Sequence, residues 1–207
     1  MSVEFPDPRQ TSPEGLVAVG GDLGVETLLT AYRQGIFPWP QEGYPMLWFC
    51  PPERGVLDFA DFHVPESLRK HSRRYKNWRY TLNTAFEKVI RECSKQKRPN
   101  QDGTWILPDM EKAYLQLFKE GYIQCLECWD GLELIGGLYG VLQNAVFSGE
   151  SMFFRKPNAS KMCLWKMVEH LQSLGHTWMD IQMITPVTAA FGGKYISRHE
   201  FLKRIGI

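Results

Sequence analysis

The stretch from Val146 to Ser173 constrains the fold of this chain most strongly. Residues 146–154 alternate small or polar with large apolar side chains, which is the period of a strand with two unlike faces. A helix is expected next, capped by Asn158 or Ser160 and ended by Gly175. Its apolar positions recur at helical spacing: Leu164, Met167, Val168 and Leu171. The stretch therefore predicts a strand, a turn and an amphipathic helix.

Glu150 lies in the middle of the expected strand, beside Phe147, Met152 and Phe153. An apolar surround disfavours an ionised carboxylate, so a buried Glu150 needs a hydrogen-bonding or cationic partner. Alternatively, Glu150 faces water from an edge strand. The sequence leaves both interpretations open.

The rest of the chain alternates between strand and helix patterns, which predicts an α+β fold with helices packed on a mostly antiparallel sheet. Residues 1 to about 22 are rich in Pro, Gly and Asp and are expected to be irregular. The proline pair Pro51-Pro52 marks a boundary between a small N-terminal lobe, residues 1–52, and a main domain, residues 53–207. Further strands are expected at 56–59, 78–83, 122–129, 132–142 and 178–183, and further helices at 25–34, 65–71, from Phe86 to Cys93, from Pro108 to Phe118, and from Arg198.

Composition excludes several classes of protein. No apolar run in the 207 residues is long enough to cross a membrane, and the N-terminus lacks the features of a signal peptide, so a cytoplasmic location is expected. The odd number of cysteines, five, fits reduced thiols better than a disulfide framework. Cys125 and Cys128 are assigned to packing, because no second ligand pair follows at zinc spacing.

A basic run with interleaved aromatic residues precedes the strand expected at residues 78–83. The net charge of +1 argues against general coating of nucleic acid, but the run itself can hold phosphates. A solvated helix end explains it as well, and both interpretations stay open. The run consists of Arg69, Lys70, His71, Arg73, Arg74, Lys76 and Arg79, and Lys95, Lys97 and Arg98 follow one helix later.

Asp180-Ile181-Gln182 is the second candidate site. In a strand, Asp180 and Gln182 point to one face and Ile181 points into the core, so the carboxylate and the carboxamide can meet the same substrate group. The Asp can orient the amide so that its oxygen faces an incoming amine. The alternative is a pair of surface side chains at a strand end. No Ser-His-Asp, Cys-His or metal-ligand pattern can be assembled from the sequence.

Trp39 stands between Pro38 and Pro40. The two prolines fix the backbone around a large ring, which suits a stacking platform for a ligand. The same arrangement suits a staple that pins the N-terminal lobe to the main domain.

Seven segments occur in an order and at spacings similar to those of a known family: Gly20–Leu23, Gly35–Trp39, Gly103–Ile106, Gly136–Gly140, Gly149–Phe153, Asn158–Lys161 and Asp180–Gln182. From about Gly15 to Leu202 the chain resembles the bacterial leucyl/phenylalanyl-tRNA–protein transferases. The resemblance implies a GNAT-like main domain. It also implies transfer of Leu or Phe from charged tRNA to proteins with N-terminal Arg or Lys, which marks them for degradation in the N-degron pathway.

The resemblance also implies roles for individual residues. It places Trp39 and Trp105 near the terminal adenosine of the tRNA, and the basic run near the acceptor stem. Glu150, Asp180 and Gln182 match polar catalytic and substrate-orienting residues. The apolar pocket for the Leu or Phe side chain is implied for Leu138, Phe147 and Met152, with Met167 where an aromatic residue often stands. The aminoacyl ester is already activated, so no cofactor and no metal is expected, and the protein is expected to act as a monomer.

The sequence departs from the family pattern in two places. Thr185–Gly193 replaces a segment that commonly contains Asn and His and ends in Ser-Leu-Gly, and Gln124-Cys125 replaces a usual His-Ser. Acceptor preference and donor pocket shape are therefore left open. Two other functions compete: a GNAT-type acetyltransferase that uses acetyl-CoA, for which no glycine-rich pyrophosphate loop is found, and a tRNA- or N-degron-binding module without catalysis.

Overall fold

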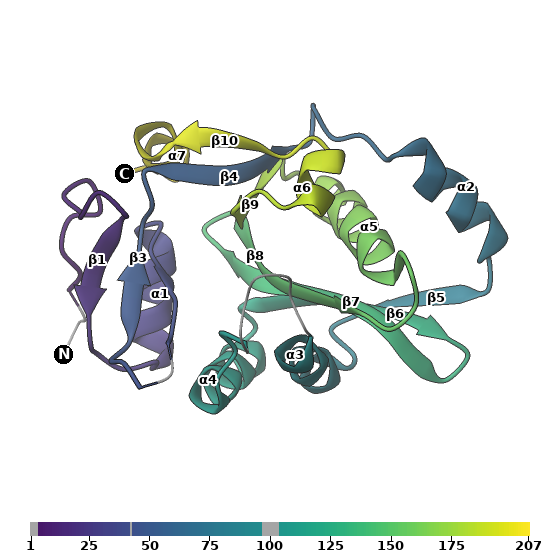
Figure 1. Ribbon diagram of the computed structural model, residues 1–207, viewed down its shortest axis with the longest axis horizontal. Coiled ribbons are helices and arrows are strands. Elements are labelled where there is room, and N and C mark those ends of the chain that lie inside the picture. The colour runs from purple at the N-terminus through teal and green to yellow at the C-terminus, as the bar shows by residue number, and fades with distance from the viewer. Residues whose placement is uncertain (1–3, 42, 97–103) are drawn as a thin grey trace.

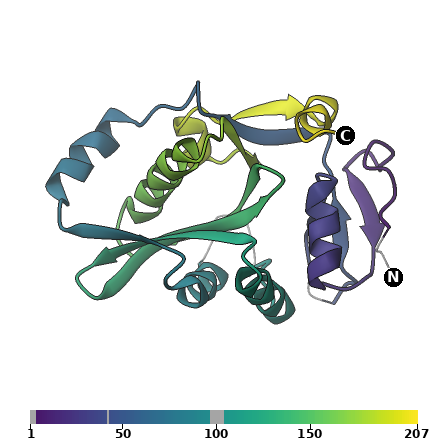
Figure 2. The same ribbon diagram turned by 180° about the vertical axis from the view of Figure 1, so that it is seen from behind.

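A computed structural model describes residues 4–41, 43–96 and 104–207 of the chain. A seven-stranded sheet forms its centre, with α3 (Phe86–Lys95) and α4 (Pro108–Lys119) below one face and α5 (Ala159–Ser173) on the other (Figures 1 and 2). Lys97, Arg98 and Gly103, which belong to segments named above, lie outside the described residues.

The large sheet has the strand order β10-β4-β9-β8-β7-β6-β5. Every neighbouring pair is antiparallel except β8 and β9, which run parallel. This confirms the predicted α+β class with a mostly antiparallel sheet. The strands are β4 (Glu53–Asp58), β5 (Trp78–Leu82), β6 (Ile123–Asp130), β7 (Glu133–Gln143), β8 (Val146–Phe154), β9 (Trp178–Gln182) and β10 (Lys194–Ser197).

The strand and the helix of the stretch that constrained the prediction form as expected, but Asn158 at the N-cap makes no side-chain capping hydrogen bond. Strand β8 has the predicted bounds, and α5 buries the four predicted apolar positions before the chain turns at Gly175, whose φ is +86°. Strand β8 lies between β7 and β9, so it is an internal strand of the sheet. The edge-strand interpretation of Glu150 is therefore wrong.

The N-terminal part forms its own three-stranded sheet in the order β1-β3-β2, at the left of Figure 1. The expectation of an irregular segment up to about residue 22 is wrong at β1, which pairs with β3. Trp48 and Leu28 belong to the same apolar core as Val89 and Tyr114 of the main body, so the two parts share one core. The elements are β1 (Leu16–Val19), α1 (Val25–Arg33), β2 (Phe37–Pro38) and β3 (Leu47–Phe49).

Three short helices complete the fold: α2 (Glu66–Arg74), α6 (Pro186–Ala190) and α7 (Arg198–Arg204). Helix α2 packs on α5 at the end of the molecule away from the N-terminal sheet (Figure 1). Helix α7 packs on β4 and β10. The sequence predicted α2 and α7 but neither α6 nor β10. In the described part of the chain, no helix is long and apolar enough to cross a membrane.

Candidate active site between β8 and β9

The parallel strands β8 and β9 pair at Ser148 and Asp180, and Asp180 is one of the predicted site residues. Each strand then leads to another predicted site residue, Glu150 in β8 and Gln182 in β9. Two positions further on, the side-chain amide of Gln182 donates from Nε2 to Oε1 of Glu150 over 2.9 Å. When Glu150 is ionised its carboxylate can only accept hydrogen bonds, and in that state the NH₂ group of Gln182 faces it. The amide oxygen of Gln182 is therefore turned away from Glu150 and is free to accept a hydrogen bond.

A buried network holds Glu150 from its other side. The hydroxyl of Tyr114 donates to Oε2 of Glu150 over 3.1 Å, and the hydroxyls of Tyr32 and Tyr114 are 2.5 Å apart. Burial raises the pKa of Glu150 to about 7, although the hydrogen bonds of the two tyrosines work in the opposite direction. Burial also raises the pKa of both tyrosines well above the ordinary value, so they remain protonated donors at neutral pH. Glu150 is thus a partnered carboxylate that can gain or lose a proton near neutrality.

Asp180 is paired with an arginine that sequence reasoning missed. Arg54 of β4 donates from Nε to Oδ1 over 2.9 Å and from Nη2 to Oδ2 over 2.7 Å, and both residues are buried. Nη1 also donates to the carbonyl oxygen of Gly35 over 3.1 Å. The guanidinium lies between the rings of Phe37 and Phe201, at 4.6 Å and 4.5 Å from their centroids. Arg54 therefore joins the central sheet to the N-terminal part and to α7.

The charge of the buried Arg54 is maintained by this pairing. Burial opposes the charge, but the attraction of Asp180 outweighs it and raises the pKa of the guanidinium above its ordinary value. A two-pronged Arg–carboxylate pair also fixes the geometry of both side chains. Removing either partner would leave a buried unpaired charge, which costs about 3–5 kcal/mol.

Asp180 also stabilises a strained turn at Gln182. The backbone N–H of Gln182 donates to Oδ1 of Asp180 over 2.8 Å, and φ of Gln182 is +58°. The N–H of Met183 donates to the carbonyl oxygen of Ile181 over 2.6 Å, so Gln182 is the centre of a γ-turn with positive φ. Such a conformation costs on the order of 1–3 kcal/mol in a residue other than Gly and persists only where its surroundings impose it.

Two predictions about Asp180-Ile181-Gln182 are therefore wrong. Asp180 is completely buried and contacts the backbone of Gln182, whereas Glu150 holds the amide of its side chain. The carboxylate of Asp180 cannot meet a substrate group beside Gln182, because Arg54 and Ser148 also occupy it. The prediction for Ile181 is correct in part, since Ile181 packs against a core cluster but is only partly buried and also lines a cavity. The turn at Gln182 interrupts the alternation that the strand geometry implied.

A cavity of about 310 Å³ opens beside Glu150, in the space between β8 and β9. We call it the apolar cavity because most of its wall is hydrocarbon or thioether. Its volume suits a side chain of the size of Leu or Phe. The apolar lining includes Leu138, Met152, Leu164, Met179, Ile181 and Val187, and the polar lining is Gln96, Glu150, Ser151, Ser160, Thr185 and Thr188.

The four residues expected in the apolar pocket divide into two groups. Leu138 and Met152 line the apolar cavity. Phe147 and Met167 do not, since both are fully buried in the core cluster behind it. They can support the wall of the cavity but cannot touch a ligand in it.

The two predicted stacking residues contact each other. The rings of Trp39 and Trp105 are stacked with centroids 5.8 Å apart and an angle of 14° between planes. Trp105 is only 4 % exposed, and its edge meets Tyr114 of the Glu150 network. Trp39 is the accessible member of the pair, and Trp105 supports it from behind.

Trp39 lines a second cavity of about 410 Å³, which we call the aromatic cavity. It lies next to the apolar cavity, because Met183 lines both. Its lining residues are Glu14, Phe37, Trp39, Gln41, Phe49, Pro51, Pro52, Glu53, Met183 and Tyr195.

The segment Thr185–Gly193, which departs from the pattern described above, forms α6 and part of the wall of the apolar cavity. Thr185 and Thr188 make a capping box, in which each side chain bonds to the other residue's backbone N–H. Their hydroxyl groups are therefore used within the helix start. Gln124 of the second departure accepts a hydrogen bond from Asn83.

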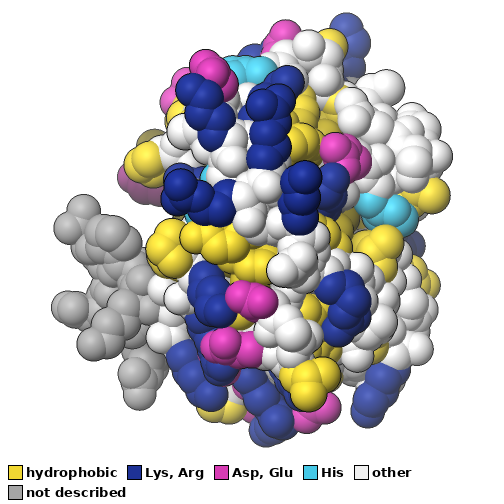
Figure 3. All heavy atoms as spheres, turned by 90° about the vertical axis from the view of Figure 1, so that its right-hand side faces the viewer, with side chains coloured by type: hydrophobic (Ala, Val, Ile, Leu, Met, Phe, Trp, Pro, Cys, Tyr) yellow, Lys and Arg dark blue, Asp and Glu magenta, His cyan; other side chains and the backbone are white. Residues whose placement is uncertain are grey.

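The residues of the basic run lie on two sides of the sheet edge that β5 forms. Arg69, Lys70, Arg73 and Arg74 are exposed on α2, and Lys76 is exposed just after it. Figure 3 shows Lys and Arg side chains gathered on this end of the molecule.

Arg79 is separated from that group by the alternation of strand β5. Its guanidinium lies over the ring of Trp129, 5.3 Å from the centroid, whereas its neighbours Trp78 and Tyr80 pack on the α5 side. Among the residues described, no group of three or more His, Cys, Asp or Glu side chains is arranged to hold a metal ion.

Comparison with known proteins identifies relatives along nearly the whole chain. Residues 56–206 match the family described as leucyl/phenylalanyl-tRNA protein transferase, and residues 21–52 match its N-terminal domain. A leucyl/phenylalanyl-tRNA–protein transferase of Anaeromyxobacter dehalogenans is 48% identical over 201 residues, 97% of this chain and 86% of the relative. One of Oleidesulfovibrio alaskensis is 45% identical over 210 residues, 98% of this chain and 84% of the relative.

Among solved structures, a C-terminal domain from Agrobacterium fabrum superimposes with a TM-score of 0.51 at 11% identity. The match covers 78% of this chain and 59% of that one. At this identity the similarity concerns the fold alone.

Glu150→Gln is expected to remove a pH-dependent loss of stability. The folded-state pKa of about 7 exceeds the ordinary value of 4.5, so between these values the folded protein holds a proton that the unfolded chain has released. This contribution to stability is full below the lower pKa and is lost as the pH rises through the higher one. Urea unfolding at about pH 5 and about pH 8 should show the variant gaining stability relative to the wild type as the pH rises. A difference that stays constant between the two pH values would contradict the assignment.

Proposed function

Because the chain belongs to the leucyl/phenylalanyl-tRNA protein transferase family, we propose that it transfers leucine or phenylalanine from charged tRNA to proteins with N-terminal Arg or Lys. The transfer of an aminoacyl group from tRNA to a protein N-terminus follows from the family, which covers both parts of the chain. The observation that carries the proposal within the site is the apolar cavity whose lining includes Glu150, the hydrogen-bond partner of Gln182. Modified proteins would enter the N-degron pathway.

The reaction needs alignment more than activation. The neutral α-amine of the acceptor attacks the ester carbonyl carbon of the aminoacyl-tRNA, an amide bond forms, and the ester bond to the ribose oxygen breaks. The amine loses a proton and the ribose oxygen gains one, so the step balances without a co-reactant. An α-amine with a pKa of about 8 is partly neutral at physiological pH. Holding the two groups together can supply roughly 7–11 kcal/mol of the barrier, and proton transfer adds about 10²–10⁴-fold.

Glu150 and Gln182 suit the alignment of the acceptor amine. Since Glu150 fixes the NH₂ group of Gln182, the free amide oxygen can accept a hydrogen bond from the attacking amine. Glu150 is poised to take up the proton that the amine loses, because its pKa of about 7 is near the operating pH. Asp180 acts as a positioning residue through the backbone of Gln182.

The donor is proposed to lie across both cavities. Its Leu or Phe side chain enters the apolar cavity against Leu138 and Met152, with Phe147 and Met167 behind the wall. Its terminal adenosine lies near Trp39, which Trp105 supports. Stacking of a base on an aromatic ring is worth about 1–3 kcal/mol.

The basic residues of α2 are proposed to hold phosphates of the acceptor stem. A further cavity of about 140 Å³ lies between α2 and α6, with Leu68 and Lys161 in its lining, and it shares Val187 with the apolar cavity. Arg79, on the other side of the sheet edge, extends the basic surface around β5.

We also propose a GNAT-like main domain, residues 53–207, behind a lobe of residues 1–52. The mostly antiparallel sheet with one parallel pair, β8 and β9, beside the apolar cavity supports the GNAT-like assignment. We further propose a cytoplasmic location, because charged tRNA is a cytoplasmic substrate. We also propose that the protein acts as a monomer.

The proposed function is tested by transfer from labelled leucyl-tRNA to peptides that differ only in their N-terminal residue. Arg and Lys peptides should be labelled, and Asp and Phe peptides should not. Gln182→Ala should reduce the transfer rate while binding of charged tRNA survives. Transfer of acetyl groups from acetyl-CoA instead would favour the acetyltransferase, and binding of tRNA without any transfer would favour the binding module.

Reversing the charge of Arg73 and Arg74 to Glu should weaken tRNA binding and reduce its dependence on salt. Each lost phosphate contact removes roughly one unit from the slope of log K against log salt. Lys203→Glu on α7, at the opposite end of the molecule in Figure 1, is the control and should leave the slope unchanged. Equal slopes for the wild type and the double variant would show that Arg73 and Arg74 contact no phosphate and belong to a solvated surface.

A further inference from the structure

The hydroxyl groups of Tyr114 and Tyr32 form a chain that leads away from Glu150. Tyr114 donates to Oε2 of Glu150 over 3.1 Å, and its oxygen lies 2.5 Å from the hydroxyl oxygen of Tyr32. Because the hydroxyl hydrogen of Tyr114 is used by Glu150, the hydrogen between the two tyrosines comes from Tyr32. Each hydroxyl group accepts one hydrogen bond while it donates another, so the chain can pass a proton from oxygen to oxygen.

A small cavity of about 20 Å³ borders the outer end of this chain. Tyr32 belongs to its lining, whereas Glu150, at the inner end of the chain, lines the apolar cavity. Among the described residues, none that lines the small cavity also lines the apolar or the aromatic cavity. The two hydroxyl groups therefore connect the site to a separate space.

The small cavity has the size and the polar lining that a water molecule needs. One water occupies about 10–15 Å³ by this measure and takes two to four polar partners. Gln143 lines the cavity together with Tyr32, and its Oε1 is buried without a hydrogen-bond partner in the described part of the chain. Leaving such an acceptor unpaired is costly, so a water that donates to it is favoured. Arg33 and Asn144 also line the cavity and are exposed, so it reaches the surface.

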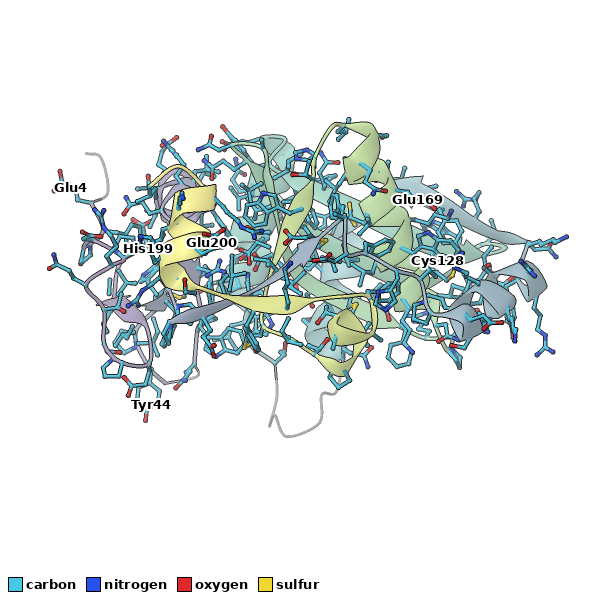
Figure 4. All side chains as sticks on the ribbon, turned by 90° about the horizontal axis from the view of Figure 1, so that it is seen from above. Glu4, Tyr44, Cys128, Glu169, His199 and Glu200 are labelled. Atoms are coloured by element: carbon cyan, nitrogen blue, oxygen red, sulfur yellow. The ribbon has the colours of Figure 1, made fainter. Side chains whose placement is uncertain are left out.

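The small cavity lies away from the surface proposed to hold the tRNA. Phe201 of α7 and Ile205, directly after this helix, belong to its lining. Figure 4, in which His199 and Glu200 mark α7, shows this helix at the end of the molecule that carries the N-terminal part. Helix α2 with its basic residues lies at the opposite end (Figure 1). The small cavity can therefore stay open to solvent while tRNA is bound.

The charged groups near this chain are paired. Asp180 of β9 and Arg54 of β4 act on Glu150 in opposite directions and pair with each other. Arg33 of α1, at the small cavity, pairs with a carboxylate on its own helix. Tyr139 of β7 is the remaining titratable side chain beside the two tyrosines. Glu150 is therefore the group in this region whose charge can change during the reaction.

The acceptor brings one proton more than the reaction uses. Below a pH of about 8 an α-amine is mostly an ammonium ion, which has no free electron pair for the attack. The transfer itself moves one proton from the amine to the ribose oxygen, so the extra proton of the ammonium ion has to leave the site. Glu150, with its pKa of about 7, can accept this proton but must release it before it can serve the attack.

We propose that the hydroxyl groups of Tyr114 and Tyr32 and one water carry this proton from Glu150 to solvent. The proposal rests on the proposed function, because it gives a route to a proton of the same reaction. An N–H bond of the ammonium ion breaks and an O–H bond forms on Glu150. That hydrogen moves to the oxygen of Tyr114, the hydroxyl hydrogen of Tyr114 moves to Tyr32, and that of Tyr32 moves to the water. The water passes a proton to solvent, so every oxygen gains one proton and loses one.

Gln143 has a positioning role in this route. Its Oε1 accepts one hydrogen of the water, which leaves a lone pair of the water free for the hydroxyl hydrogen of Tyr32. Without that acceptor, the water has no fixed orientation at the end of the chain.

The rival interpretation is that the two tyrosines only hold Glu150 in place. It predicts the same loss of activity at every pH, because a misplaced carboxylate serves charged and neutral acceptors equally badly. A proton route predicts a loss only where the acceptor is an ammonium ion, because a neutral amine brings no extra proton.

The test is Tyr32→Phe in the full chain, which removes the outer hydroxyl group and leaves Tyr114 to hold Glu150. The single-turnover rate of transfer to a peptide with N-terminal Arg should fall about 10- to 100-fold at about pH 6.5, where the acceptor is charged. At about pH 9 the rate should equal that of the wild type, and binding of charged tRNA should be unchanged at both pH values. Gln143→Leu should show a smaller loss with the same dependence on pH. Tyr122→Phe is the control, since Tyr122 is half-buried and lines none of the three cavities.

Two kinetic results would overturn the proposal: a wild-type rate for Tyr32→Phe at about pH 6.5, or a loss that is equally large at about pH 9. A crystal structure of the wild type separates this proposal from the proposed function, because it does not depend on transfer. It should show a water that is hydrogen-bonded to the hydroxyl of Tyr32 and to Oε1 of Gln143. If that water is present but the wild type transfers nothing, the route is assigned correctly and the function is wrong. If the wild type transfers leucine but the small cavity holds no such water, the route is wrong and the function stands.

Discussion

The site depends on one buried ion pair, between Arg54 and Asp180. The two residues are 126 positions apart in sequence, and the guanidinium also bonds to Gly35 and lies between Phe37 and Phe201. The pair thereby connects the central sheet to the N-terminal part and to α7. A buried pair of this kind adds little net stability, because desolvation offsets most of the attraction. Its effect here is positional: with its charge satisfied by Arg54, Asp180 can hold the N–H of Gln182 in a γ-turn that the chain would otherwise leave.

Much of the scaffold could be predicted from sequence because its signals are local. Two patterns can each be recognised within a single element, and both predictions are confirmed. They are the alternation in residues 146–154 and the helical spacing of Leu164, Met167, Val168 and Leu171. The same holds for Phe86, Val89, Ile90 and Cys93, which are the buried side chains of α3. Leu138 and Met152 came from the resemblance, and both line the apolar cavity.

The parts that sequence missed depend on contacts between distant elements. Arg54 stands alone between Glu53 and Gly55, and no periodicity marks an arginine that will be buried. The placement of Asp180 failed because a strand pattern cannot reveal the turn at Gln182, and Trp105 is covered by Trp39 and Tyr114, which come from other parts of the chain. Strand β10 was missed because it is short and mostly exposed, so it has no apolar alternation. Glu150 stayed ambiguous for a related reason: its partners Tyr114 and Gln182 come from two other elements.

The central claim is that Asp180 contributes to transfer only through the position of Gln182. A double-mutant cycle on kcat/KM tests it most directly, with Asp180→Asn, Gln182→Ala and the combined variant. The account predicts that each single change lowers kcat/KM strongly and that the double variant is little worse than the more damaging single one, because residues that act as a unit are not additive. Binding of charged tRNA should survive in all three variants, measured where circular dichroism shows that Asp180→Asn is folded, because this change leaves the buried Arg54 without its charge partner. Losses that multiply independently would contradict the claim and give Asp180 a separate role.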